Sequence, residues 1–282
     1  ALLIVTPTQI DRTASDDQVT WRAALEYDVT PDNLLYASFE TGFRAGGFNL
    51  TFGQEEYDPE YIDAYTIGAK NSFFDNRLQI NADVFQQDFV DQQLNFSVPN
   101  TTSDTTVANA GESTLKGFEM DATWLASEQL LLILNYAYLS ASIEPSRNPL
   151  SGELDDGFVF DSAPRHAYTA AAEWTLWRSL QWGEVVANAT YAFTDERNGG
   201  GVREFATFDA DRMDDLTVLN ARLGWYDIPL MGGVLDLALW SKNLLDEEYS
   251  ISNVHNLPQA GRSVMFGEPR SYGADLIYRW AS

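Results

Sequence analysis

The two histidines of the chain, His166 and His255, are the first residues to test for metal or catalytic chemistry. They lie far apart, neither has a histidine four residues away, and the chain contains no cysteine, so no transition-metal site is predicted. The aspartates between 209 and 215 resemble an oxygen-rich calcium loop, but the glycine and the distal glutamate of that motif are absent. Spacing supports no Ser, His and acid arrangement. We therefore expect no enzyme and no cofactor.

Cationic side chains in an acidic chain are the remaining candidates for binding chemistry. The chain has 17 Lys+Arg against 42 Asp+Glu, a formal net charge of -25, which argues against a nucleic-acid partner. A cation in a long polar segment could bind an anionic group of a ligand, or it could pair with a neighbouring acid. The candidate ligand-binding residues are Arg44, Arg203, Arg212, His255 and Arg262.

Alternating apolar and polar residues predict the elements that position these side chains. Leu25 and Tyr27, for example, alternate with Glu26 and Asp28, which is the pattern of a two-faced strand. The same pattern recurs along the chain and predicts eleven strands. Their approximate ranges are 17–28, 34–43, 60–70, 76–92, 114–125, 129–143, 165–177, 184–195, 215–226, 234–243 and 268–280.

The connections between these strands alternate between short and long. Short ones are expected at 29–33, 71–75, 126–128, 178–183 and 227–233, and long ones at 44–59, 93–113, 144–164, 196–214 and 244–267. Short connections at one end of the strands and long connections at the other are typical of an outer-membrane β-barrel. Strands of about 9–11 residues or more are typical of it too. The tryptophans Trp124, Trp174, Trp225 and Trp280 all fall at the short-turn end, as an interfacial belt requires. A soluble β-sandwich or propeller would also alternate and stays open as an alternative.

Several short strings resemble the C-terminal part of TonB-dependent outer-membrane receptors, in the order and spacing of that family. They are Thr41-Gly42-Phe43-Arg44-Ala45-Gly46-Gly47-Phe48-Asn49, Tyr65-Thr66-Ile67-Gly68, Asn109-Ala110-Gly111, Ala163-Pro164-Arg165-His166, Asn243-Leu244-Leu245-Asp246 and Gly267-Glu268-Pro269-Arg270. Two positions depart from the family pattern. Thr66 stands where the family often has Glu, and Ala281 and Ser282 follow the terminal aromatic Trp280.

The resemblance implies an all-β, antiparallel transmembrane barrel of about 22 strands around an N-terminal plug. We expect residues 1–282 to supply eleven of those strands as a partial barrel domain, with the plug absent from this chain and the first and last strands unpaired. The resemblance further implies a bacterial outer-membrane location and TonB-dependent uptake of a nutrient such as a ferric siderophore. The implied partners are outer-membrane lipid, the small-molecule ligand, and the TonB complex through the plug. A passive porin-like channel, complete in itself, is the alternative.

Overall fold

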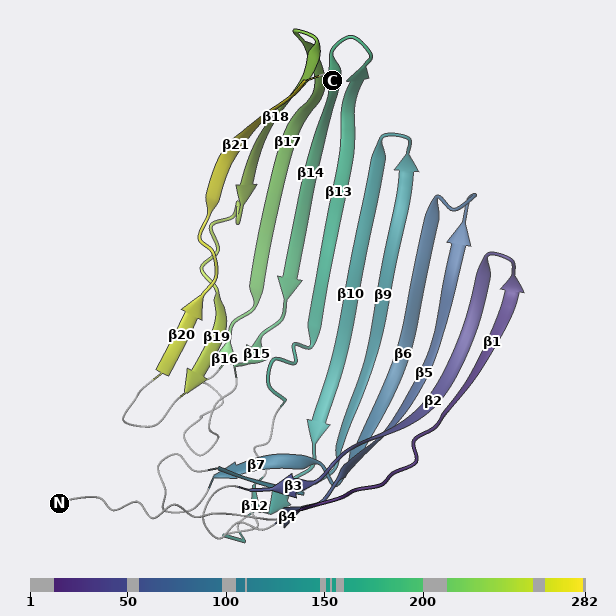
Figure 1. Ribbon diagram of the computed structural model, residues 1–282, viewed down its shortest axis with the longest axis vertical. Coiled ribbons are helices and arrows are strands. Elements are labelled where there is room, and N and C mark those ends of the chain that lie inside the picture. Colours follow the sequence, from purple (N-terminus) through teal and green to yellow (C-terminus); the bar gives the residue numbers. More distant parts are fainter. Residues whose placement is uncertain are drawn as a thin grey trace, which may run out of the picture.

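The structure, a computed structural model, describes residues 13–49, 56–97, 105–109, 111–147, 151–152, 154–155, 160–199, 212–255 and 262–280. Eleven long strands form one antiparallel sheet whose strand order follows the chain (Figure 1). They are β1 (Arg22–Thr30), β2 (Asn33–Arg44), β5 (Glu60–Phe73), β6 (Leu78–Val90), β9 (Ser113–Ser127), β10 (Leu130–Ile143), β13 (His166–Ser179), β14 (Gly183–Thr194), β17 (Leu216–Leu230), β18 (Gly233–Lys242) and β21 (Ser271–Trp280). All eleven predicted strands are confirmed, although β1 and β21 begin later than the alternation indicated.

Short turns join the long strands in pairs at one end of the sheet. At the β17–β18 turn, Met231 and Gly232 have φ of 47° and 81°, as in a type I′ turn, whose twist matches that of the two strands. The opposite end carries the long connections, here named loop 1 (45–59), loop 2 (91–112), loop 3 (144–165), loop 4 (195–215) and loop 5 (243–270). The predicted alternation of short and long connections is therefore confirmed.

Each long loop contains a small two-stranded ribbon that the sequence did not predict. In chain order the ribbons pair β3 (Gly47–Phe48) with β4 (Glu56–Tyr57), β7 (Gln93–Ser97) with β8 (Thr105–Asn109), β11 (Ser146–Arg147) with β12 (Leu154–Asp155), β15 (Arg197–Asn198) with β16 (Arg212–Met213), and β19 (Ser250–His255) with β20 (Arg262–Phe266). The ribbons gather at the loop end of the sheet (Figure 1).

The strand register gives the sheet one apolar and one polar face, because residues paired across antiparallel strands lie on the same side. Leu25, Ala37, Ile67, Val84 and Phe118 are paired in turn across β1, β2, β5, β6 and β9. The neighbouring row on the other face reads Glu26, Tyr36, Gly68, Asp83 and Glu119. These two rows define the apolar face and the polar face.

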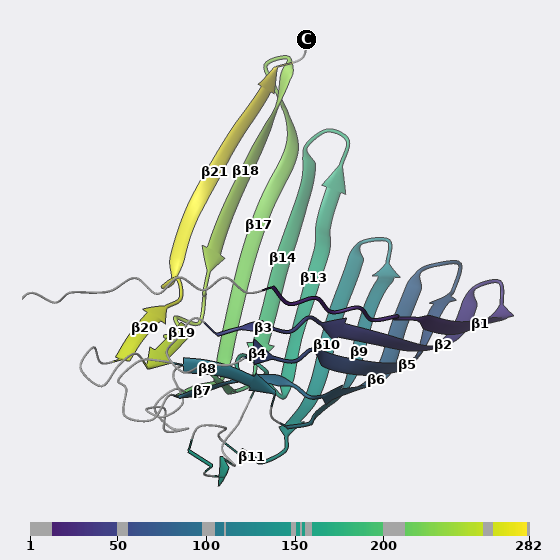
Figure 2. The same ribbon diagram turned by 60° about the horizontal axis from the view of Figure 1, so that its bottom comes forward.

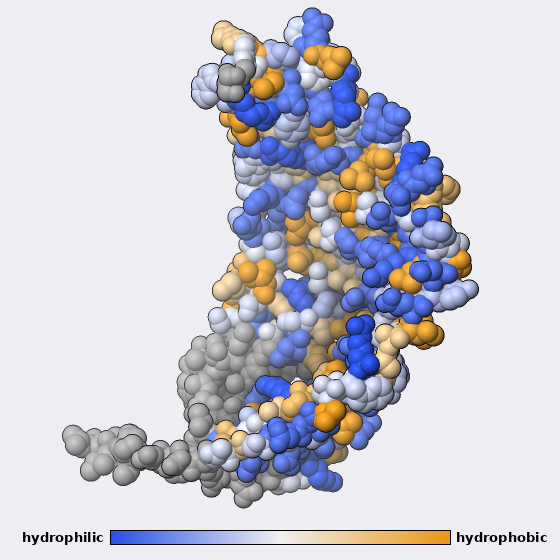
Figure 3. Space-filling view, turned by 45° about the vertical axis from the view of Figure 1, so that its right-hand side comes forward, coloured by the Kyte–Doolittle hydropathy of each residue, from blue (hydrophilic) through white to orange (hydrophobic). Residues whose placement is uncertain are grey.

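Large apolar side chains on the apolar face are left uncovered. Leu25 is 71% exposed, Ile67 64% and Leu239 64%, and the only apolar side chains buried among the described residues are Phe96, Val186, Met213 and Ala238. A soluble sandwich would bury its apolar face in a core, so this distribution argues against that alternative. The space-filling view shows hydrophilic and hydrophobic residues interleaved over the strands (Figure 3).

The sheet is a curved wall with two free edges rather than a closed barrel (Figure 2). Among the described residues β1 pairs only with β2, and β21 only with β18, as expected. Two aromatic belts cross the apolar face. Trp124, Trp174, Trp225 and Trp280 lie near the short turns, and a second belt nearer the long loops includes Trp21, Phe39 and Tyr65, whose neighbouring rings are 4.8 Å apart. No described helix is long and apolar enough to cross a bilayer.

Candidate ligand site

A cavity of about 480 Å³ lies where loops 3 and 4 meet the loop end of β10. Its wall includes Leu139 and Ile143 of β10, Phe160 of loop 3, and Arg197 and Arg212 of loop 4. Leu139 is paired with Gly117, which is itself paired with Phe85, so it continues a row of the polar face. The cavity therefore joins the polar face to the long loops.

Two arginines bring unused hydrogen-bond donors to this cavity. They lie on opposite strands of the β15–β16 ribbon, in which Arg197 pairs with Met213 and Asn198 with Arg212. Arg212 forms an ion pair with Glu196 through Nη2, while its Nε is buried without a partner among the described residues. Arg197 Nη1 and Asn198 Oδ1 are likewise buried and unpaired there. Buried polar atoms are normally hydrogen-bonded, so the two guanidinium nitrogens suit an acceptor or anionic group, and the amide oxygen suits a donor.

Contacts from loops 3 and 5 hold this ribbon in place. Asn198 Nδ2 donates to Asp161 Oδ1 at 2.9 Å, and the Ser162 amide donates to the Asn198 carbonyl at 2.9 Å. On the other side, the fully buried Asn253 donates through Nδ2 to the Arg212 carbonyl at 3.1 Å. The positions of the two arginines thus depend on three loops that are far apart in sequence.

The predicted ligand residues do not converge on one described site. Arg44, at the end of β2, is 4.0 Å from Glu60 and belongs to the base of loop 1. His255 and Arg262 are register partners in the β19–β20 ribbon of loop 5. Arg203 lies outside the described residues. Of the five, Arg212 lines the cavity.

Arg197 was not named among the candidate ligand residues, although it lies inside the long connection predicted at 196–214. The charge of Arg197 was visible in the sequence. The pairing of β15 with β16, which brings Arg197 next to the strand that carries Arg212, was not. Arginines at the first positions of a long loop would have been the useful signal.

His166 belongs to the second aromatic belt, and Arg165, which also lines the cavity, contacts that belt through Tyr138. The Tyr136 hydroxyl is 2.9 Å from His166 Nδ1, and the His166 ring lies 5.2 Å from that of Tyr138. The Arg165 guanidinium lies 5.9 Å from the centre of the Tyr138 ring, and its hydrogen bond to the Tyr138 hydroxyl raises the pKa of Arg165. Among the described residues, no His, Cys, Asp and Glu grouping could hold a metal ion.

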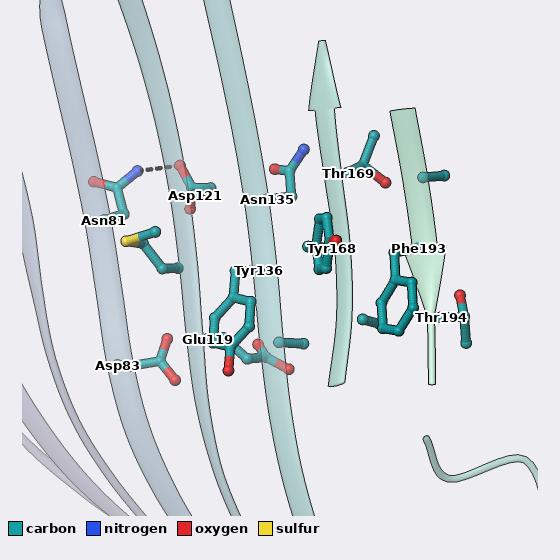
Figure 4. Close-up of a pocket in the computed structure, with 14 residues that line it drawn as sticks. Asn81, Asp83, Glu119, Asp121, Asn135, Tyr136, Tyr168, Thr169, Phe193 and Thr194 are labelled. Carbon is teal, nitrogen blue, oxygen red and sulfur yellow. Dashed lines mark hydrogen bonds between the residues drawn. The ribbon is translucent and has the colours of Figure 1, made fainter. Parts of the chain in front are cut away.

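A second, shallow pocket of about 410 Å³ lies on the polar face and is acidic (Figure 4). Asp83, Glu119 and Asp121 line it from two neighbouring strands. Asn81 Nδ2 donates to Asp121 Oδ2 at 2.9 Å, and the Tyr36 hydroxyl donates to Asp83 Oδ2 at 3.2 Å. Thr66, where the family often has Glu, occupies the same face as the register partner of Phe85. This face is polar enough to line a wet lumen.

A curved antiparallel wall with an apolar outer band, short turns at one end and ribbon-bearing loops at the other is the architecture of a large transmembrane β-barrel. The family model "TonB dependent receptor-like, beta-barrel" matches residues 5–280. The chain belongs to this family.

The chain is similar to several curated receptors of the family. It is 26% identical over 211 residues to the probable TonB-dependent siderophore receptor PiuA of Acinetobacter baumannii, covering 70% of this chain and 28% of that protein. It is 22% identical to the catecholate siderophore receptor Fiu of Escherichia coli, covering 94% of this chain and 33% of that protein. The chain therefore spans about a third of the length of these relatives.

The fold is shared with solved receptors. The ferric yersiniabactin uptake receptor FyuA from Yersinia pestis aligns with a TM-score of 0.70 at 17% identity, over 94% of this chain and 38% of that one. These relatives are transport receptors, so the expectation of no enzyme agrees with the family.

Proposed function

We propose that this chain forms part of the barrel wall and outer loops of a TonB-dependent outer-membrane receptor that imports a ferric siderophore. The apolar face contacts outer-membrane lipid, the polar face lines the lumen, and the long loops face the outside of the cell. An exposed strand edge is not tolerated in lipid, so β1 and β21 pair with further strands of the receptor. Those strands bring the barrel to about 22 and enclose a plug that contacts the TonB complex.

The observation that supports ligand binding is a pair of buried guanidinium nitrogens in the loop 3–loop 4 cavity, Arg197 Nη1 and Arg212 Nε, that have no partner among the described residues. Siderophores chelate iron through oxygen-rich, commonly anionic groups, and arginine donates to such groups in a planar, two-pronged geometry. Glu196 neutralises part of the charge in the free protein through its ion pair with Arg212. A ligand oxygen would then bind the nitrogens that Glu196 leaves unused.

Uptake and binding measurements on the full-length receptor test this proposal. Competition with a panel of iron chelates, cobalamin and oligosaccharides identifies the ligand class. Arg197→Ala and Arg212→Ala should each weaken binding of the preferred iron chelate about tenfold, because a hydrogen bond to a charged group contributes about 1.5–3 kcal/mol. Arg178→Ala is the matched control, since Arg178 is paired with Glu184 at the short-turn end, 2.7 Å away.

The same measurements separate this proposal from a passive channel. Import of the chelate should stop in cells that lack TonB. Import that continues without TonB, or that is linear in ligand concentration without saturation, contradicts the receptor function.

A further inference from the structure

A buried asparagine of loop 5, Asn253, lies against the strand that carries Arg212. β19 packs against β16 at this point, although each strand pairs with another partner in its own ribbon (Figure 1). Asn253 is 0% exposed, and its Nδ2 donates to the Arg212 carbonyl oxygen at 3.1 Å. Burying an amide costs free energy unless its hydrogen bonds are made, so this bond gives the amide a defined orientation. Asn253 therefore fixes the backbone of a residue whose side chain lines the cavity.

The root of loop 5 is held by a second buried asparagine, Asn243, which is 2% exposed. Its backbone amide donates to Asn220 Oδ1 of β17 at 3.0 Å, which attaches the start of the loop to the wall. Its side-chain Nδ2 donates to the carbonyl oxygens of Glu247 and Glu268, at 2.8 and 3.2 Å. Glu268 lies near the other end of the loop. One buried side chain thus ties both ends of loop 5 together.

A ring packed on a glycine and an ion pair add to the root. The Gly267 amide donates to the Tyr249 carbonyl at 2.8 Å, and a Cβ at Gly267 would come within 1.9 Å of the Tyr249 ring. Arg270 Nη2 is 3.0 Å from Asp246 Oδ2, a half-exposed pair that contributes little by itself. These contacts determine where loop 5 leaves the wall, and so where β19 meets β16.

The ribbon that carries Arg212 needs support from outside itself. β15 and β16 pair through only two residues each, and an isolated two-stranded ribbon is at best marginally stable. Asn198 and loop 3 support the β15 side, whereas Asn253 and the burial of Met213, which is 2% exposed, support the β16 side. The Arg212 side chain is long and has many rotamers, so its direction depends on a fixed backbone.

We infer that Asn253 is a positioning residue of the ligand site, and that loop 5 acts on this site by fixing the β16 backbone at Arg212. The inference rests on the proposed function, which assigns Arg212 to the ligand. Asn253 is not among the described residues that line the cavity. Removal of its amide should therefore weaken ligand binding although every cavity-lining side chain is retained.

Modification of arginines by phenylglyoxal, mapped by peptide mass spectrometry in the full-length receptor, tests the positioning role without a ligand. In Asn253→Ala the modification rate of Arg212 should rise about fivefold, because the loss of one hydrogen bond shifts a local opening equilibrium by about that factor. Arg178 is the internal reference, since it lies at the short-turn end with its side chain 67% exposed. Its rate should stay unchanged.

Asn49→Ala is the matched control for Asn253→Ala. Asn49 Nδ2 also donates to a backbone carbonyl of another loop, that of Val107 at 2.8 Å, but it joins loops 1 and 2. This variant should leave the rate at Arg212 unchanged. An unchanged rate at Arg212 in Asn253→Ala overturns the inference. An equal rise in Asn49→Ala, or an equal rise at Arg178, overturns it too, because either result would show general loosening.

A third variant covers failure of Asn253→Ala to fold, which a heat-modifiable gel shift detects. Asn253→Ser keeps a hydroxyl donor in place of the amide. Its modification rate at Arg212 should lie above that of the unaltered receptor and below that of Asn253→Ala. A rate equal to that of the unaltered receptor in both variants contradicts the positioning role.

A double-mutant cycle then connects positioning to binding. The probe is the iron chelate that binds most tightly in the competition panel. Asn253→Ala should weaken its binding about fivefold in the unaltered receptor and have no further effect in Arg212→Ala, because the two residues act through one guanidinium. Additive losses overturn the inference. Full affinity in Arg212→Ala, together with raised Arg212 reactivity in Asn253→Ala, would instead contradict the proposed function and support the positioning of Arg212 by Asn253.

Discussion

Arginines in this wall differ in how completely their nitrogens are bound. Within the long strands, Arg222 Nη1 is 2.7 Å from Asp275 Oδ2 and its Nε donates to the Tyr226 hydroxyl at 3.0 Å. Arg279 is bound by Asp227 and Asp236. Arg197 and Arg212, in contrast, each keep a buried nitrogen unpaired within the described part of the chain. This difference, which charge counting cannot show, separates arginines that hold strands together from those available to a ligand.

Aromatic rings of neighbouring strands pack directly against glycines on the polar face. A Cβ at Gly117 would come within 2.3 Å of the Phe85 ring and 2.8 Å of the Tyr138 carbonyl oxygen. Gly117→Ala should therefore destabilise the barrel by about 1–3 kcal/mol, the usual cost of overpacking. Urea unfolding followed by tryptophan fluorescence measures it.

Gly42→Ala supplies the comparison for Gly117→Ala. The added Cβ at Gly42 meets only the Cγ2 atom of Ile62, at 2.9 Å, which is a side chain that can move. The loss at Gly42 should be the smaller of the two. Equal losses would show that backbone contact at Gly117 does not matter.

At the scale of elements, the sequence predicted the long strands well and the loop ribbons not at all. Alternation over ten or more residues specifies which face of β9 or β17 is apolar. Each face contacts one environment along its whole length, so the residues on that face share one polarity. A two-residue ribbon such as β15–β16 is below the length at which alternation is detectable. The candidate site depends on that ribbon. Arg212 could therefore be proposed from its charge, but its position beside Arg197 in one cavity could not.

Loops 1 and 2 are joined by hydrogen bonds that resemble strand pairing. Asn49 Nδ2 donates to the Val107 carbonyl and Asn49 Oδ1 accepts from the Val107 amide, both at 2.8 Å. Asn49→Ala should remove both bonds and increase hydrogen exchange of the Val107 amide about tenfold, since the two bonds contribute about 1–2 kcal/mol to local stability. The exchange rates of β5 amides should stay unchanged. Unaltered exchange at Val107 would mean that other contacts hold the two loops together.

The last strand, β21, is tied to its neighbours by a buried carboxylate. Asp236 is 7% exposed, accepts from the Asp227 amide at 2.9 Å, and binds Arg279 Nη1 and Nη2 at 2.5 and 3.1 Å. Asp236→Ala removes these acceptors from β17 and β21 together, so the urea midpoint of unfolding should fall.

Glu40→Ala is the control for Asp236→Ala. Its ion pair with Arg22 is exposed on both sides, at 65% and 47%, and exposed pairs contribute little. The midpoint of this variant should stay close to that of the unaltered receptor. A larger effect at Glu40 than at Asp236 would contradict the role of the buried carboxylate.

For the whole molecule, the arrangement of turns and loops predicts one orientation in the membrane. Loops 1 to 5 should face outward and the short turns inward, which is the orientation of outer-membrane barrels. The chain has no cysteine, so a single introduced cysteine is the only site in it that a thiol reagent can label. Ser151→Cys in loop 3 should react with a membrane-impermeant maleimide on intact cells, whereas Glu128→Cys in the exposed β9–β10 turn should react only after the outer membrane is opened. Labelling of Glu128→Cys alone on intact cells would reverse the orientation and remove the Arg197–Arg212 cavity from contact with an external ligand.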